Sequence, residues 1–311
     1  MVSKRLSLGV LVVTGLPFLG LTVTPDAHAR TRCSYAGPPE NVLTVRVTGD
    51  ALAVIERNRE EILVGEKRPR RCSGGVPSVL NTDVIRVRTR GLFAFADLSL
   101  GGGPFAPGAT PEPEGAPEIE VEFGGVEPLS SVVGTSGPDE FHWGLEGGLA
   151  GLNLNPGTAN DQDVDVTMTV GGFFGGILIA DGADGNDRIV PAPGARLPAE
   201  AESEGGPGDD LLIAPRSGGD LEGEEGNDVL LGGSSFDELD GGAGSDRLLG
   251  RGRADEIRGG LGTDLLSGGR GGDFLRDRDD KRDVMRCGSG RDRVKADRHD
   301  RLRGCELVSR R

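Results

Sequence analysis

One nine-residue pattern runs through residues 205–285 and limits the possible folds more than any other feature of the chain. In blocks of nine, this segment reads GGPGDDLLI, APRSGGDLE, GEEGNDVLL, GGSSFDELD, GGAGSDRLL, GRGRADEIR, GGLGTDLLS, GGRGGDFLR and DRDDKRDVM. The eighth position is apolar in every block, and the sixth is aspartate in all but the second and ninth. A chain with 54 glycines and 4% aromatic residues could be disordered on composition alone. The fixed register instead predicts a repeating folded structure.

These blocks resemble the hemolysin-type (RTX) calcium-binding nonapeptide, GGxGxDxUx, in which U is a large apolar residue. The blocks that begin at Gly205, Gly241, Gly259 and Gly268 match every specified position. The resemblance implies an all-β fold, a parallel β-roll in which each nonapeptide forms one turn and one short strand. Two blocks then make a coil of about 18 residues, and calcium lies between the turns of successive coils.

The physical chemistry of the residues supports a metal-dependent roll. One buried Leu contributes about 1.5–3 kcal/mol, whereas ordering nine backbone units costs about 9–18 kcal/mol. Like-numbered aspartates stacked about 5 Å apart repel by about 3 kcal/mol at an effective dielectric constant near 20. A calcium ion reverses that sign because it takes six to eight oxygen ligands, and glycine lets turn carbonyls point inward. We therefore interpret the aspartates as metal ligands and the glycines as residues that shape the ligand loop.

The two edges of the roll differ in their glycine pattern. The odd-numbered blocks supply the candidate metal-site residues Asp210, Asp228, Asp246 and Asp264, with the glycines Gly205, Gly208, Gly226, Gly241, Gly244, Gly259 and Gly262. On the even edge, Gly219 stands in place of the first aspartate, and Ser235 and Arg253 replace fourth-position glycines. We expect about three good calcium sites on the odd edge and weak or no sites at Asp237, Asp255 and Asp273. The alternative is that these aspartates only solvate turns.

The segments before the repeats are also predicted to be β-rich. NVLTVRV, DVIRVRTR, LFAFADLSL and EIEVEF in residues 30–133 read as strands, and ALAVIERNREEILV reads as a helix or as two strands around a turn. This region is either a separate sandwich or the start of one long solenoid. Residues 134–204 read as irregular solenoid-like rungs, in which Asp139 and Asp187 are candidate isolated ligands or turn aspartates. Residues 101–118 are a Pro/Gly-rich linker or a long surface loop.

The N-terminus reads as a secretory signal. Lys4 and Arg5 precede an apolar stretch that ends at Ala27–Ala29, and Gly15, Pro17 and Gly20 argue against the alternative of a membrane anchor. Cleavage after residue 29 would leave 33 basic and 49 acidic residues, a net charge of −16. This charge makes nucleic acid an unfavourable partner and favours cations. We expect a secreted, extracellular protein that is not membrane-bound after signal removal.

Four cysteines remain, and in an oxidising compartment we expect two disulfides. Cys287 and Cys305 are one coil length apart, as are Val284 and Leu302, so the two cysteines are expected to lie over one another within bonding range. Cys33 is then left for Cys72. Residues 286–311 carry net positive charge, either as an end cap whose arginines pair with the acidic roll or as a patch for anionic cell-envelope or matrix polymers.

No sequence signature of an enzyme stands out. The chain has no HExxH helix and no GxSxG elbow, and His142 in FHWG reads as a strand residue. We expect a non-enzymatic calcium-binding protein of structural or surface role. The alternative is a hydrolase of unrecognised type in residues 30–204, with the roll as a stabilising appendage.

Overall fold

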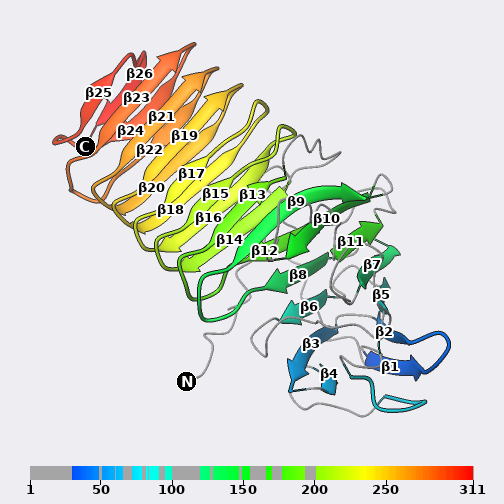
Figure 1. Ribbon diagram of the computed structural model, residues 1–311. Helices are drawn as coiled ribbons and strands as arrows, with labels where there is room; N and C mark the ends of the chain where they lie inside the picture. Colours follow the sequence, from blue (N-terminus) through cyan, green and yellow to red (C-terminus); the bar gives the residue numbers. More distant parts are fainter. Residues whose placement is uncertain are drawn as a thin grey trace, which may run out of the picture.

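The computed structural model describes residues 30–48, 51–59, 61–65, 72–78, 82, 84–90, 95–99, 120–126, 129–146, 149–154, 166–169, 177–192 and 201–310. Every named element in these ranges is a β-strand, and the strands form two sheets (Figure 1). Within the same ranges there is therefore no helix of the length and apolarity needed to cross a membrane. The predicted all-β class is confirmed. The predicted signal and the Pro/Gly-rich segment 101–118 lie outside the described residues.

The first sheet has fourteen described strands, in the spatial order β1 (Arg30–Ala36), β2 (Val42–Thr48), β5 (Val84–Arg90), β7 (Glu120–Val126), β11 (Val166–Thr169), β10 (Leu149–Leu154), β9 (Glu140–Glu146), β13 (Arg188–Pro191), β15 (Leu211–Ile213), β17 (Val229–Leu231), β19 (Arg247–Gly252), β21 (Leu265–Arg270), β23 (Val284–Ser289) and β25 (Arg301–Arg303). The second has twelve, in the order β26 (Leu307–Arg310), β24 (Arg293–Ala296), β22 (Phe274–Arg276), β20 (Glu256–Gly262), β18 (Glu238–Gly244), β16 (Gly219–Glu225), β14 (Ala201–Pro207), β12 (Ile177–Asp181), β8 (Leu129–Val133), β6 (Phe95–Ser99), β3 (Leu52–Asn58) and β4 (Glu61–Gly65).

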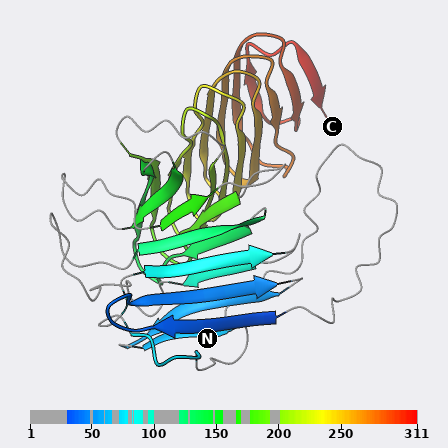
Figure 2. The same ribbon diagram turned by 90° about the vertical axis from the view of Figure 1, so that its right-hand side faces the viewer.

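From β12 to β26 the chain alternates strictly between the two sheets, and each strand pairs in parallel with the strand two positions later. This is the predicted parallel β-roll. Figure 1 shows its strands stacked like rungs up to β25 and β26, and Figure 2 shows β1 and β2 at the opposite end.

The N-terminal strands belong to the same two sheets. β5 pairs in parallel with β2 and β7, and β6 pairs in parallel with β3 and β8. Of the two alternatives left open by the sequence, the structure shows the start of one long solenoid. The helix-like stretch is two strands around a turn, because β3 and β4 pair in antiparallel fashion.

The core of the roll is two columns of single apolar side chains. The column from the first sheet consists of Leu212, Leu230, Leu248 and Leu266. The column from the second sheet consists of Leu221, Leu239, Ile257, Leu275 and Val294. All of these side chains are at most 1% exposed. In the ninth block the prediction was wrong by one residue. Leu266 stands opposite Met285 rather than Val284, because one extra residue in the preceding turn shifts the register.

Both predicted disulfides are present. Cys33 bonds to Cys72 with a Cα–Cα distance of 4.8 Å, and Cys287 bonds to Cys305 with a Cα–Cα distance of 5.2 Å. The expected 18-residue match of Val284 with Leu302 is wrong, because Val284 stands opposite Arg301. The last coil is therefore one residue shorter than expected at its strands, while the cysteines still meet across it.

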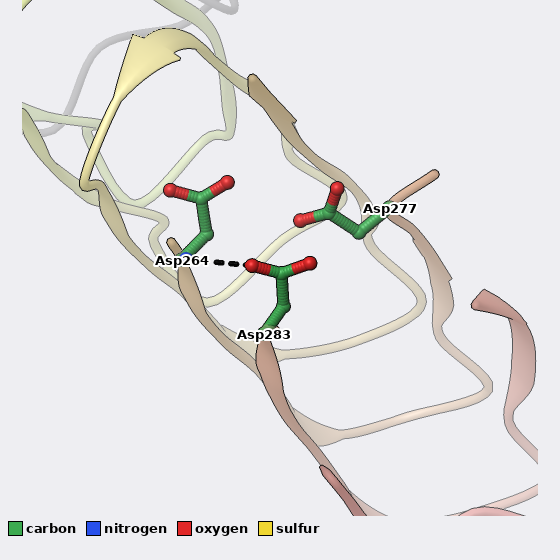
Figure 3. Close-up of side chains that lie close together, drawn as sticks. All are labelled: Asp264, Asp277 and Asp283. Carbon is green, nitrogen blue, oxygen red and sulfur yellow. Dashed lines mark hydrogen bonds between the residues drawn. The ribbon is translucent and has the colours of Figure 1, made fainter. Parts of the chain in front are cut away.

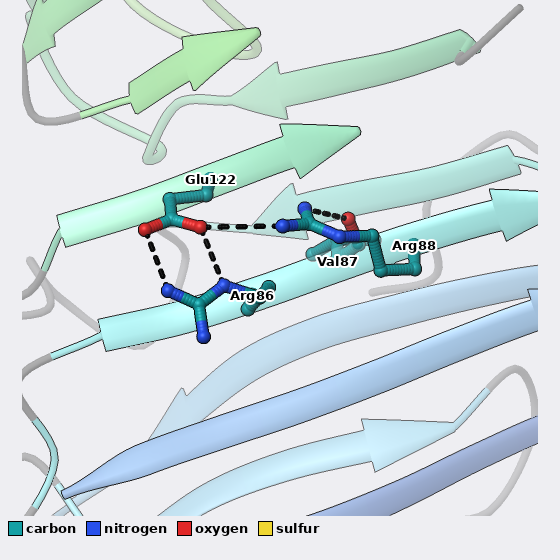
Figure 4. Close-up of polar contacts among 4 residues, drawn as sticks. All are labelled: Arg86, Val87, Arg88 and Glu122. Carbon is teal, nitrogen blue, oxygen red and sulfur yellow. Dashed lines mark hydrogen bonds and ion pairs between the residues drawn. The ribbon is translucent and has the colours of Figure 1, made fainter. Parts of the chain in front are cut away.

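Outside the roll, an ordinary ion pair joins neighbouring rungs. Arg86 on β5 donates to both carboxylate oxygens of Glu122 on β7, at 2.6 and 2.9 Å, and Arg88 lies on the other side of the same carboxylate (Figure 4). The hydrogen bond from Arg86 is the main cause that lowers the pKa of Glu122. At the turns of the roll, by contrast, burial raises the pKa of the aspartate carboxyls.

Candidate metal centre

Eight aspartates form one continuous column along the odd edge, which we call the odd ladder. Its members are Asp139, Asp187, Asp210, Asp228, Asp246, Asp264, Asp283 and Asp300, all at most 6% exposed. Each backbone N–H donates to Oδ1 of the next member, at N···O distances of 2.7–3.1 Å. One oxygen of each acceptor carboxylate is therefore used to hold successive coils in register.

The even edge carries a shorter column of the same kind, the even ladder. It comprises Asp237, Asp255, Asp273, Asp292 and Glu306, and it begins where the N–H of Gly219 donates to Asp237. The donor–acceptor distances are 2.8–3.1 Å, as on the odd edge. The two edges therefore share one backbone-to-carboxylate arrangement.

The second carboxylate oxygen of most ladder members is buried without a hydrogen-bond donor. This holds for Oδ2 of Asp187, Asp210, Asp228, Asp246, Asp255, Asp264, Asp273, Asp283 and Asp292. Three aspartates differ, since Oδ2 of Asp139 accepts from the N–H of Thr135, Oδ2 of Asp237 from that of Gly233, and Oδ2 of Asp300 from that of Asp297. A buried carboxylate oxygen without a partner is costly, and a hard cation is one group that satisfies it.

The first-position glycines leave an oxygen-lined space beside the ladder carboxylates that follow them in the chain. A methyl group added to Gly223 would lie 2.5 Å from Oδ2 of Asp228 and 2.6 Å from the carbonyl oxygen of Gly241 in the next coil. At Gly241 the corresponding distances are 2.6 Å to Oδ2 of Asp246 and 2.5 Å to the carbonyl oxygen of Gly259. Carboxylate and carbonyl oxygens are the ligands that calcium uses, so the residues fit this ion.

The fourth-position glycines are required for a steric reason. Gly244 has a φ of +155°, and a Cβ there would overlap the carbonyl oxygen of Gly226 in the preceding coil. Gly226 and Gly262 meet the preceding carbonyl in the same way. Any side chain at these positions would push neighbouring coils apart.

The ladder carboxyls have pKa values well above the ordinary value for aspartate. Burial is the main cause that raises the pKa of Asp228 and of Asp246 from 3.8 to about 7, and neighbouring ladder charges add to it. Burial likewise raises the pKa of Asp255 to about 7. The largest of these rises is at Asp277, whose pKa reaches about 9 through burial and through the charges of Asp283, Asp264 and Asp279. The raised pKa values mean that the charged form of these carboxyls is disfavoured in the folded roll, and a bound cation would stabilise that form.

The repeat family can be assigned from this region. A family model, the RTX calcium-binding nonapeptide repeat, matches residues 222–252 and 240–275 with four copies. These residues are RTX calcium-binding repeats. RTX nonapeptide repeats bind calcium, which agrees with the oxygen-lined turns described above. Neither a comparison with curated proteins nor one with solved structures gives a match.

All of the sequence-predicted aspartates lie on the two ladders. Asp210, Asp228, Asp246 and Asp264 are on the odd ladder, and Asp237, Asp255 and Asp273 are on the even ladder. The predicted glycines precede the odd-ladder aspartates in the chain, within or directly after strands β14, β16, β18 and β20; they are Gly205, Gly208, Gly226, Gly241, Gly244, Gly259 and Gly262. Which of these residues ligate calcium stays a prediction.

Apart from the partnered Oδ2 of Asp237, the expected difference between the two edges is not visible in burial or hydrogen bonding. Asp246 and Asp255 are each 2% exposed, and each has an unpartnered Oδ2. The turns do differ in backbone, because Arg253 holds a φ of +80° at the position where Gly244 stands on the odd edge. The preference for the odd edge therefore rests on the glycine pattern alone.

Several ladder members escaped the sequence reasoning because they break the nine-residue register. Asp283 accepts the N–H of Asp264 although 19 residues separate them, and Asp300 accepts that of Asp283 after 17 residues. Asp139 and Asp187 are joined to the odd ladder rather than isolated. A search that allowed one-residue insertions and deletions between coils would have found Asp283 and Asp300.

The contacts of the basic tail residues at the described positions are with an aromatic ring and with backbone carbonyls, and both alternatives given for the tail stay predictions. Arg293 and Lys295 lie over the ring of Phe274, at 5.8 and 5.1 Å from its centroid. Arg310 donates to the backbone carbonyls of Asp297 and Asp300, which ties down the end of the chain. The tail thus completes both sheets as the last coil through backbone contacts.

Proposed function

We propose that this protein is a secreted, non-enzymatic calcium-binding β-solenoid of structural or surface-associated role, whose roll folds when it meets calcium outside the cytoplasm. The observation that carries the proposal is the row of buried Oδ2 atoms without partners along both edges. Without a cation these groups oppose folding, and the thin core of single apolar side chains offers little to offset them.

Calcium-coupled folding can be tested directly. Far-UV circular dichroism of the full chain is recorded while calcium is added to chelated protein and then removed again. We expect β signal and melting temperature to rise with calcium and to fall with chelator. If the β signal and the melting temperature in excess chelator equal those in calcium, folding is not coupled to calcium binding and the proposal is refuted.

Secretion is supported by two observations. Both disulfides, Cys33–Cys72 and Cys287–Cys305, suit an oxidising compartment. Residues 1–29 have the charge and hydropathy pattern of a cleaved signal. Expression of the full chain in a secreting bacterial host is expected to give an exported protein that begins at Arg30, whereas deletion of residues 1–29 should leave it inside the cell. Export without residues 1–29 would contradict this assignment.

A charge change along one outward-facing column supports surface association. In register across the second sheet, Glu222 and Asp240 are followed by Arg258, Arg276 and Lys295, and all three basic residues are exposed. Arg258 and Asp240 form an ion pair at 2.9 Å where the sign changes. The basic end of this column suits an anionic cell-envelope or matrix polymer. We expect the protein to bind an anionic polysaccharide in a salt-sensitive way and to lose this binding when Arg276 and Lys295 are replaced by glutamate. Binding that is unaffected by these changes would refute surface association through this column.

The non-enzymatic part of the proposal is supported by the first rungs. The hollow bounded by Thr31, Arg46 and Ser73, as far as the described residues show, is lined by neither carboxylate nor histidine. His142 lies on β9 and contacts Glu140 at 2.9 Å, on the same strand. Screening the calcium-loaded protein against ester, glycoside and peptide substrates tests this point, and turnover of any of them would favour the hydrolase alternative.

A further inference from the structure

Three aspartates converge where the roll leaves its nine-residue register. One carboxylate oxygen from each of Asp264, Asp277 and Asp283 lies within 4.8 Å of the other two, and all three side chains are buried. Asp264 and Asp283 are consecutive members of the odd ladder, and Asp277 points toward them from the facing strand segment (Figure 3).

Asp277 is the residue that distinguishes this cluster from the other turns. It is 1% exposed, and no hydrogen-bond donor reaches either of its carboxylate oxygens. Oδ2 of Asp264 and Oδ2 of Asp283 are likewise without partners. Buried carboxylate oxygens of three residues thus lie close together with no hydrogen-bond donor between them, an arrangement that needs a cation or a shared proton.

The sequence explains how Asp277 comes to lie there. The first position of the odd blocks is glycine at 205, 223, 241 and 259, but the ninth block has Asp277 instead. At Gly241 the space beside the glycine faces a backbone carbonyl of the next coil, that of Gly259. At Gly259 that space faces Oδ2 of Asp277, together with Oδ2 of Asp264 at 2.8 Å from the position of an added methyl group. Beside Gly259, the carboxylate of Asp277 therefore takes the place that a backbone carbonyl holds beside Gly241.

The extra residue in the turn between β22 and β23 accompanies this change. Leu265 pairs with Val284, 19 residues later, whereas Arg247 pairs with Leu265 after 18. The longer turn follows Asp277 directly and carries Asp283 into the ladder position. Substitution and insertion together give this turn three carboxylates where a regular turn has two ladder carboxylates and a carbonyl.

We propose that Asp264, Asp277 and Asp283 form a calcium site of a separate class, with three carboxylate ligands and higher affinity than the regular RTX turns. Calcium affinity in proteins rises with the number of charged ligands and with the rigidity of the site. Both factors favour this site, because it offers the ion three carboxylate ligands once they are deprotonated, and the disulfide Cys287–Cys305 lies in the coil immediately beyond it. The same charge makes a trivalent lanthanide a suitable probe. The proposal requires calcium binding by the chain and does not depend on its secretion or surface role.

Three variants of the full chain test the site. Asp277→Asn removes one charge at nearly constant shape, and Asp277→Gly restores the residue found at the same position of the other odd blocks. Asp280→Asn is the matched control, because Asp280 is exposed in the same turn and asparagine tolerates its φ of +67°. Calcium binding is measured by isothermal titration and native mass spectrometry, and folding at saturating calcium is checked by circular dichroism.

We expect the tightest class of calcium binding, one ion per chain, to weaken at least tenfold in both Asp277 variants and to be unchanged in Asp280→Asn. Equal affinities and stoichiometry in wild type and Asp277→Asn would overturn the proposal while leaving calcium binding by the repeats intact. Wild-type protein that binds no calcium at all would instead refute the calcium-coupled folding proposed above.

A measurement on the unaltered protein covers the case in which the variants fail to fold. Crystals grown with terbium should show anomalous scattering between the three carboxylates, with Tb–O distances to Asp277 near those of calcium, about 2.3–2.6 Å. Scattering at the regular turns but none beside Asp277 would show that the three carboxyl groups share protons rather than a cation, and would also overturn the proposal.

Discussion

Replacing Asp246 by asparagine should change the stability of the roll in opposite directions with and without calcium. In the unaltered chain the N–H of Asp228 donates to Oδ1 of Asp246 at 2.8 Å. The side-chain oxygen of asparagine can accept the same hydrogen bond, so the contact between coils is kept. It removes the negative charge and the unpartnered carboxylate oxygen, which is buried among like charges. The substitution thus separates the charge of the ladder from its hydrogen bonding.

The size of the effect follows from the pKa of Asp246, which burial and the charge of Asp264 raise from 3.8 to about 7. A carboxyl whose pKa is raised by folding opposes folding increasingly as the pH rises above its unfolded-state pKa, and the full cost applies above its folded-state pKa. Keeping the carboxylate charged at pH 8 therefore costs the folded state about 4 kcal/mol, and screening at a turn near solvent reduces this to about 2 kcal/mol. In chelator at pH 8, Asp246→Asn should stabilise the roll by about this amount.

With calcium the sign reverses, because the substitution removes a charged oxygen ligand. A tenfold loss of affinity at the adjoining turns corresponds to about 1.4 kcal/mol of lost stabilisation. The chelated protein is assayed by far-UV circular dichroism as trimethylamine N-oxide is added, and the calcium-loaded protein by urea unfolding. Asp184→Asn is the control, since Asp184 is an exposed turn aspartate with the same charge change. Destabilisation by Asp246→Asn in both conditions would refute the electrostatic account of the ladder.

Three further predictions concern pH, glycine and the terminal disulfide. The raised pKa values of the ladder aspartates mean that chelated protein should lose β structure as the pH rises from about 4 through 7, which circular dichroism at fixed ionic strength checks. Gly244→Ala should destabilise the calcium-loaded roll by at least about 2 kcal/mol because its Cβ would overlap Gly226, while Gly252→Ala, with its nearest contact at 3.9 Å, should change urea unfolding little; equal effects would contradict the steric argument. Replacing Cys287 and Cys305 by serine should lower stability by about 3 kcal/mol, the chain-entropy value for a loop of this length, and an unchanged melting temperature would contradict it.

The nine-residue pattern was sufficient to predict the local features of the roll. Alternation along each short strand places the eighth residue of a block inside, so Leu248 and Ile257 were predicted as core residues and are fully buried. The aspartates two residues earlier, Asp246 and Asp255, come just before these strands and were therefore predicted to lie at the turns. The disulfide pairs followed from coil length, which the resemblance to RTX repeats supplied, and the one-residue error at Val284 shows the limit of that reasoning.

Only the tertiary structure decided what happens where coil length varies. Asp139, Asp187 and Asp210 follow one another in the odd ladder after 48 and then 23 residues, spacings that no fixed period predicts. Their alignment depends on hydrogen bonds between strands of successive coils, and these bonds form between neighbours in space whatever the length of chain between them. The same register brings Asp277 and Asp283 to Asp264, because an inserted residue is absorbed in a turn while the strands on either side stay paired. Local sequence therefore determined which way each side chain faces, and the pairing of coils determined which carboxylates meet.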